Sequence, residues 1–145
     1  MSEHVERFDL ERFVRAQEGM HEVAAAELRR GRKDSHWMWF VFPQLAGLGR
    51  SATAARYAIS GTSEARAYLR HPVLGPRLAV MTDLATTAPA SSVEALMGGI
   101  DAVKLRSSMT LFAAVADDPA PFRAALDRWW SGRPDPVTLD LLGTH

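Results

Sequence analysis

The sequence contains no cysteine. Disulfide bonds, thiolate nucleophiles and cysteine-ligated zinc are therefore excluded. Signals for β-structure are also scarce, because no Asn-Gly or Asp-Gly hairpin turn occurs and no segment alternates cleanly between apolar and polar residues. Internal repeats, low-complexity segments and long linkers are absent as well, so nothing divides the chain into parts.

An excess of charge of one sign is missing too. Seventeen basic residues balance 17 acidic ones. A general nucleic-acid binder or membrane-surface protein usually carries a basic excess, so we expect neither partner. The longest apolar run, Trp37–Phe42, is far too short to span a bilayer, and the polar start MSEHVERFDLER does not resemble a signal peptide. We therefore expect a soluble, cytoplasmic protein.

Motifs of metal or nucleophilic catalysis are not found. Glu18 and His21 form a single E-x-x-H pair, whereas a di-iron bundle requires a second pair and two further glutamates. There is no G-x-S-x-G motif and no Walker loop, and Gly47-Leu48-Gly49 alone is too short to indicate a phosphate site. We expect no metal and no cofactor, and whether the protein is an enzyme stays open.

The chain does contain many helix signals. Its 145 residues, 47% hydrophobic and 23% charged, fit one domain over 1–145, with an ordered core at about residues 8–142. Caps, first-turn prolines and apolar spacing predict helices over about 9–30 (interrupted at Gly19), 36–41, 60–69, 72–86, 91–98 and 101–116, and two more opened by Asp118-Pro119 and Asp135-Pro136. We predict an all-α, compact single-domain bundle of about six to eight short helices in irregular orthogonal packing.

Local details of these helices are also predicted. Asp9 and Thr62 are candidate N-caps, and Ser91 with Glu94 reads as a capping box. Either Asp34 or Ser35 could cap the 36–41 helix. The glycine-rich segment 45–55 is expected to be a loop.

The most unusual stretch is Ser35–Leu45, SHWMWFVFPQL. Large aromatic side chains dominate core packing, so the simple interpretation is a buried wall, formed as a short helix or as a strand. On a helix, Trp37 and Trp39 point in different directions, so at least one could reach a cleft. The donors Lys33, His36 and Gln44 flank this apolar block, as in a small-molecule pocket.

A second stretch, Lys104–Phe112 (KLRSSMTLF), opens a helix that is apolar nearly all round from Met109 onward. Such a helix is expected to be central and buried. Its first turns would then carry buried or nearly buried polar groups, namely Lys104, Arg106, Ser107 and Ser108. Buried cations need partners, so either acids from other helices or an anionic ligand must satisfy them.

Two surface features suggest other functions. The cluster Arg29, Arg30, Arg32 and Lys33 fits a solvated helix C-terminus, or alternatively a phosphate or RNA contact. Trp129 and Trp130, with Arg123, Asp127 and Arg128 nearby, could form a protein-facing patch, since tryptophan and arginine are favoured at interfaces.

The motifs S-H-W-M-W-F-x-F-P-Q and K-L-R-S-S-M-T-L-F resemble a bacterial family of unknown function whose members are often labelled calpastatin. The resemblance extends from about Phe8 to Leu142. It implies a compact all-helical domain and brings no established activity. Calpastatin itself is a disordered inhibitor built from repeats, so that label does not suit this globular, repeat-free composition.

These residues are compatible with two functions. The first is binding of a small anionic ligand, for example a nucleotide-like one, in a cleft lined by Trp37, Trp39, Lys104 and Arg106, with His36 as the weakest candidate for a catalytic acid–base. The full set of candidate ligand-binding residues is Lys33, His36, Trp37, Trp39, Gln44, Lys104, Arg106, Ser107 and Ser108. The alternative is a non-enzymatic interaction module that binds a protein partner through the Trp/Arg patch.

Overall fold

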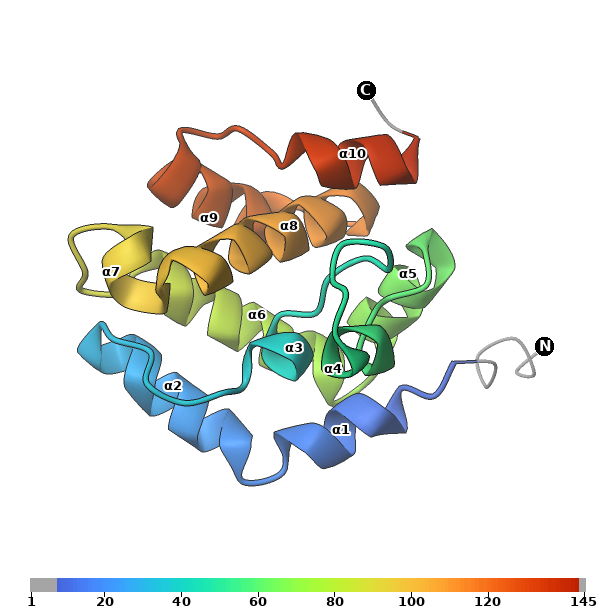
Figure 1. Cartoon of the computed structure of the whole chain (residues 1–145), viewed down its shortest axis with the longest axis horizontal. Helices are drawn as coiled ribbons and strands as arrows, with labels where there is room; N and C mark the ends of the chain where they lie inside the picture. Colours follow the sequence, from blue (N-terminus) through green and yellow to red (C-terminus); the bar gives the residue numbers. More distant parts are fainter. Residues whose placement is uncertain (1–7, 144–145) are drawn as a thin grey trace.

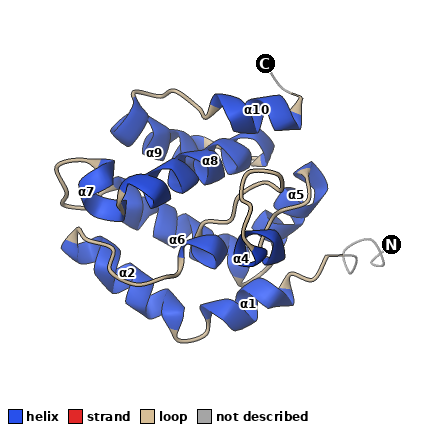
Figure 2. Cartoon of the chain, viewed as in Figure 1, coloured by secondary structure: helices blue, strands red, loops and turns tan. Residues whose placement is uncertain are grey.

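The computed structural model describes residues 8–143, and within them it contains ten helices and no strand. The helices are α1 (Glu11–Gln17), α2 (Met20–Arg30), α3 (Met38–Val41), α4 (Ala52–Arg56), α5 (Thr62–Arg70), α6 (Leu74–Thr86), α7 (Val93–Met97), α8 (Gly99–Val115), α9 (Ala120–Trp130) and α10 (Pro136–Leu142). The all-α prediction is confirmed (Figure 2). Seven helices have at least seven residues, and the total exceeds the predicted six to eight because Gly19 divides the 9–30 segment into α1 and α2 and because α4 was not predicted.

Helix α8 lies at the centre of the fold (Figure 1). It packs against α3, α5, α7, α9 and α10, while α6 packs against α2, α5 and α9. Helices α1 and α2 lie on the opposite side of the molecule from α10. Among residues 8–143, no helix has the length and apolar character needed to cross a bilayer.

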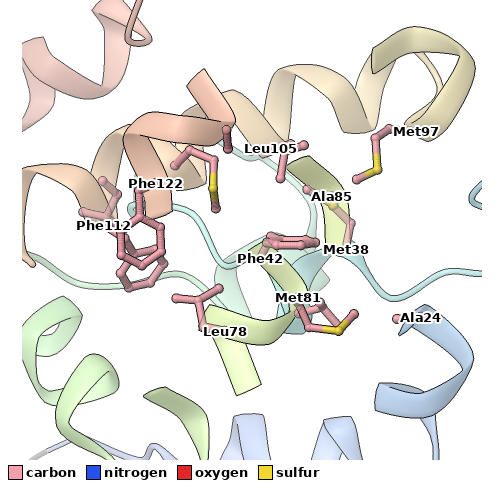
Figure 3. Close-up of a cluster of buried hydrophobic side chains, with 14 of the residues drawn as sticks. Ala24, Met38, Phe42, Leu78, Met81, Ala85, Met97, Leu105, Phe112 and Phe122 are labelled. Carbon is pink, nitrogen blue, oxygen red and sulfur yellow. The ribbon is translucent and has the colours of Figure 1, made fainter. Parts of the chain in front are cut away.

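The core explains why α8 is apolar nearly all round. The consecutive residues 107–112 are all buried, so neighbours surround the helix on every side in this part. Figure 3 shows Phe112 and Phe122 together at one end of the cluster, with Phe42, Met38 and Met81 further along. Because α8 is enclosed, its polar residues near the N-terminus must either find partners or reach the surface.

Glycines determine where α2 begins and ends. Gly19 adopts φ 76° and separates α1 from α2, as predicted. Gly31 ends α2 with φ 86°, and a Cβ atom at this position would lie 2.6 Å from the carbonyl oxygen of Pro89. Only glycine combines this left-handed backbone with so close an approach.

Several predicted caps were wrong by one residue. Ser92, not Ser91, caps α7 by accepting from the N–H of Ala95. Gly61, not Thr62, precedes α5, and Asp9 makes no side-chain cap to α1. Neighbouring serines or threonines offer the same chemistry, so local pattern does not choose between registers.

The segment 45–55 was predicted to be a loop, and that prediction was wrong for its second half. Ser51 accepts from the N–H of Ala54 and opens the short helix α4. At the start of the segment, Leu45 pairs with Ile59 in an isolated bridge. This bridge fixes residues 44–46 against Ile59, and Gln44 lines the site described below.

Candidate functional site

The aromatic stretch Ser35–Leu45 changes conformation at Trp37, the residue before helix α3. Helix α3 starts only at Met38, and Trp37 precedes it with non-helical backbone angles of φ −131° and ψ 3°. The Trp37 side chain is fully buried, and its indole N–H donates to the Glu27 carboxylate at 2.9 Å. Trp37 is therefore a core residue, and it does not line the surface crevice described below.

Glu27 organises the turn before α3. Its Oε1 accepts from the backbone N–H groups of Asp34 (2.8 Å) and Ser35 (2.9 Å), and its Oε2 accepts from the Ser35 hydroxyl at 2.5 Å. Burial raises the pKa of Glu27, but the hydrogen bonds from Ser35, Asp34 and Trp37 outweigh it and lower the pKa to about 2. Asp34 and Ser35 thus bind Glu27 of α2. The prediction that one of them caps the next helix was wrong.

The Lys33 side chain is nearly buried, and partners within the protein contact its ammonium group. Its side chain is 6% exposed, and its ammonium group lies 2.8 Å from Oδ2 of Asp101. The same group donates to the carbonyl of Ser35 and lies 4.8 Å from the centre of the Trp37 ring. Lys33 therefore links the aromatic stretch to the first turn of α8.

Lys104 is the more available of the two cations. Its side chain is 22% exposed, and its ammonium group lies 4.6 Å from the centre of the half-buried Trp39 ring. The distance to Oδ1 of Asp101 is 3.8 Å, longer than the 2.8 Å contact of Lys33. Asp101 thus serves two ammonium groups with one charge and binds Lys33 more closely.

A hollow of about 450 Å³, here called the cationic hollow, lies over these groups. It is lined by Lys33, His36, Trp39, Met97, Gly98, Gly99, Ile100, Asp101 and Lys104. Gly98 precedes α8 with φ 85° and has no side chain with which to cap the helix. The first N–H groups of α8, which carry partial positive charge, are therefore left without a side-chain cap at this wall.

Two further hollows adjoin the cationic hollow. One, of about 460 Å³, shares Ile100 and Lys104 with it, and the other, of about 180 Å³, shares Trp39. These two hollows also share Gln44 and Gly49 with each other. The three hollows share these lining residues and are together called the crevice below; their walls come from α3, the 44–49 segment, α4 and the N-terminal half of α8.

The structure brings six of the nine predicted ligand-binding residues to this crevice: Lys33, His36, Trp39, Gln44, Lys104 and Ser107. The other three lie elsewhere. Trp37 is in the core, and the buried hydroxyl of Ser108 has no hydrogen-bond partner in the described part of the chain. Arg106 donates to the carbonyls of Arg133 and Pro134, both at 3.0 Å, and so fastens the loop before α10.

Two residues important to the crevice were not among the predicted ones. Asp101 is the acid that pairs both lysines, and its position three residues before Lys104 was a usable signal. Ile100 projects from the first turn of α8 and lines two of the hollows. No sequence signal distinguished this isoleucine from a core residue.

The other predicted surface features are largely paired within the protein. Arg30 forms an ion pair with Asp34, and Arg32 lies 3.4 Å from the same carboxylate. The guanidinium of Arg128 lies 3.8 Å from the centre of the Trp129 ring, and the indole N–H of Trp129 donates to the Ala85 carbonyl. These contacts join α9 to the end of α6, and a protein partner on this face stays a prediction.

Candidate metal ligands do not gather in the described part of the chain, where no group of three or more His, Asp or Glu side chains is placed to hold an ion. The crevice offers two ammonium groups, the Asp101 carboxylate, the His36 imidazole, an uncapped helix N-terminus, an indole face and the Gln44 amide. This combination suits recognition of an anion with an apolar or planar part.

The fold and the site together define an all-α domain with a cationic crevice at the start of its central helix. Residues 7–142 match the family described as protein of unknown function (DUF1810), and the chain belongs to that family. It is similar to the conserved hypothetical protein Rv1873 from Mycobacterium tuberculosis, solved by crystallography at 1.38 Å, with 49% identity and a TM-score of 0.92. The match covers 95% of this chain and 99% of that chain. No curated protein matches the chain.

Proposed function

We propose that the crevice binds a small anionic molecule and that Lys104 makes the principal contact with its charge. The observation that carries this proposal is the position of the Lys104 ammonium group. It lies over the Trp39 ring at the edge of the cationic hollow and only 3.8 Å from an Asp101 carboxylate that Lys33 holds more closely. An anion placed here would complete the pairing of Lys104.

The charge balance of the hollow supports an anionic ligand. Lys33 and Lys104 contribute two positive charges and Asp101 one negative charge, so the hollow carries a net charge of about +1. The uncapped N-terminus of α8 adds the equivalent of roughly half a positive charge. Because Gly98 and Gly99 lack side chains, a phosphate or carboxylate could approach the backbone N–H groups closely.

The neighbouring side chains favour a ligand with a planar or apolar part. Trp39 lines the cationic hollow and the 180 Å³ hollow, so its indole separates the two. Gln44 adds an amide that can both donate and accept, as nucleotide-like ligands require. His36 is exposed at the rim, where an imidazole could exchange protons with a bound ligand.

The test is thermal denaturation followed by calorimetric titration with pyrophosphate, AMP, ADP-ribose and a sugar phosphate. A ligand present at 100 times its Kd adds about 2.7 kcal/mol to stability and raises Tm measurably. We expect at least one of these anions to raise Tm, and Lys104→Met to weaken its binding at least tenfold. Arg123→Met is the matched control, because Arg123 is an exposed cation on α9 and lines a different hollow.

Two results would contradict the proposal. One is a Tm that none of the four anions changes at millimolar concentration. The other is an anion that Lys104→Met and the wild-type protein bind equally well, since the charge contact would then lie elsewhere.

A further inference from the structure

The 460 Å³ hollow, here called the apolar groove, differs in chemistry from the cationic hollow beside it. Its side-chain walls come from the 44–49 segment, the start of α8 and the start of α10, and include Leu48, Ile100, Val103 and Val137. Its volume lies within the range of small-molecule sites. Lys104 lines both hollows, so one ammonium group stands where they meet.

The apolar side chains of this groove are strongly exposed. Ile100 is 76% exposed, Val103 63% and Val137 54%. Three large aliphatic residues from two helices thus face solvent around a single hollow, whereas residues of this type are usually buried. Covering them would be favourable by about 25 cal/mol for each Å² removed from water.

Two polar groups of the groove, Ser107 and Asp135, are already occupied by partners within the protein. The Ser107 hydroxyl donates to the Val103 carbonyl at 3.1 Å and to Oδ2 of Asp135 at 3.2 Å. Oδ2 of Asp135 also accepts from the N–H and the hydroxyl of Thr138. A ligand in the groove would therefore meet aliphatic surface along most of its length and a cation at one end.

We infer that the ligand of the crevice is amphipathic, with an anionic head beside Lys104 and an alkyl or aryl arm along Ile100, Val103 and Val137. This inference rests on the proposed function and narrows its ligand class to organic phosphates or carboxylates with an apolar substituent. The position of Lys104 supports this inference: its ammonium group would bind the anionic head, and the apolar groove begins at the same residue.

The experiment measures Kd by calorimetry for methyl, butyl, hexyl and octyl phosphate, each below its critical micelle concentration. Each fully buried methylene group contributes up to about a fourfold gain in affinity. We expect affinity to rise two- to fourfold per methylene up to at least hexyl phosphate. In Val103→Ser/Val137→Ser the gain should fall below 1.5-fold per methylene, while the Kd of methyl phosphate changes less than twofold.

The control variant is Val80→Ser, which changes a half-exposed valine of α6 that does not line the groove. It should retain the chain-length dependence of the wild type. Lys104→Met should weaken binding of the whole series, because every member presents the same head.

The outcomes separate the two proposals. Binding of none of the phosphates, with no effect of the anions used above, contradicts the proposed function and this inference together. Equal affinity across the series overturns the amphipathic ligand while leaving anion binding intact. A chain-length gain that survives Val103→Ser/Val137→Ser overturns the groove as its location. A dimer in sedimentation that those two substitutions dissociate, and that octyl phosphate does not, assigns the groove to a second copy of the chain and also overturns the inference.

Discussion

Replacing Glu27 by Gln tests whether the turn before α3 is held by charge. The carboxylate accepts four hydrogen bonds, three of them at Oε1 from Asp34, Ser35 and Trp37. Hydrogen bonds to a charged acceptor are worth about 1.5–3 kcal/mol each, against roughly 0.5–1.5 kcal/mol for neutral pairs. The variant keeps a carbonyl oxygen for the three N–H donors but loses the charge that strengthens each bond.

The expected loss follows from these contacts. Weakening three bonds by about 1 kcal/mol each gives an upper value near 3 kcal/mol, and partial access of water to the turn reduces it to about 2–3 kcal/mol. For a chain of this size each kcal/mol corresponds to roughly 2–4 °C, so Tm should fall by about 4–12 °C. Urea unfolding followed by circular dichroism at pH 7 measures the difference. Glu22→Gln is the control, since Glu22 is exposed on the same helix.

The pH dependence distinguishes charge from shape. Since the pKa of Glu27 is lowered from 4.5 to about 2, its contribution is complete above pH 4.5 and is lost as the pH falls toward 2. The gap in unfolding free energy between wild type and Glu27→Gln should therefore shrink to roughly half by pH 3. A gap below about 0.5 kcal/mol at pH 7, or one that stays constant from pH 6 to pH 3, would refute this reasoning.

Two further predictions concern stability. Gly31→Ala should cost about 2–4 kcal/mol in urea unfolding, because the new Cβ would lie 2.6 Å from the Pro89 carbonyl oxygen. Gly19→Ala has a similar φ and open space, so it should cost only about 1 kcal/mol, and equal losses would remove the clash as the cause. Ser108→Ala should leave stability unchanged or raise it by up to about 1 kcal/mol, because the buried hydroxyl has no hydrogen-bond partner among residues 8–143. Ser107→Ala should lower stability through loss of the Asp135 contact, and the reverse order would contradict this account.

Local chemistry allowed much of the fold to be predicted. Asp135 with Pro136 opens α10 as expected, because an N-cap depends on residues within one turn of each other. The break at Gly19 and the burial of α8 followed from backbone freedom and apolar spacing in the same way. The sequence could not show that Ser92 and not Ser91 caps α7, since both serines offer a hydroxyl at the helix start.

The candidate site depended on contacts that local patterns do not contain. Whether Trp37 or Trp39 reached the surface was decided by Glu27, ten residues before Trp37, which binds the Trp37 indole in the core. Trp39, one residue into α3, then turns toward Lys104. A tertiary partner thus separated two residues that the sequence presented as equivalent.

The distribution of lysine and arginine explains why Lys104 and Arg106 have different roles. Lysine accounts for only two of the 17 basic residues, and both lysines lie at the cationic hollow. Two arginine side chains fasten loops instead: Arg12 donates to the carbonyls of Arg56 and Ala58, and Arg106 donates to two carbonyls before α10. A guanidinium fork suits several fixed carbonyls at once, whereas a compact ammonium group can move between an acid, an indole face and a ligand. At the start of α8, the ammonium group of Lys104 is therefore available to an anion, whereas the guanidinium of Arg106 is held by two carbonyls.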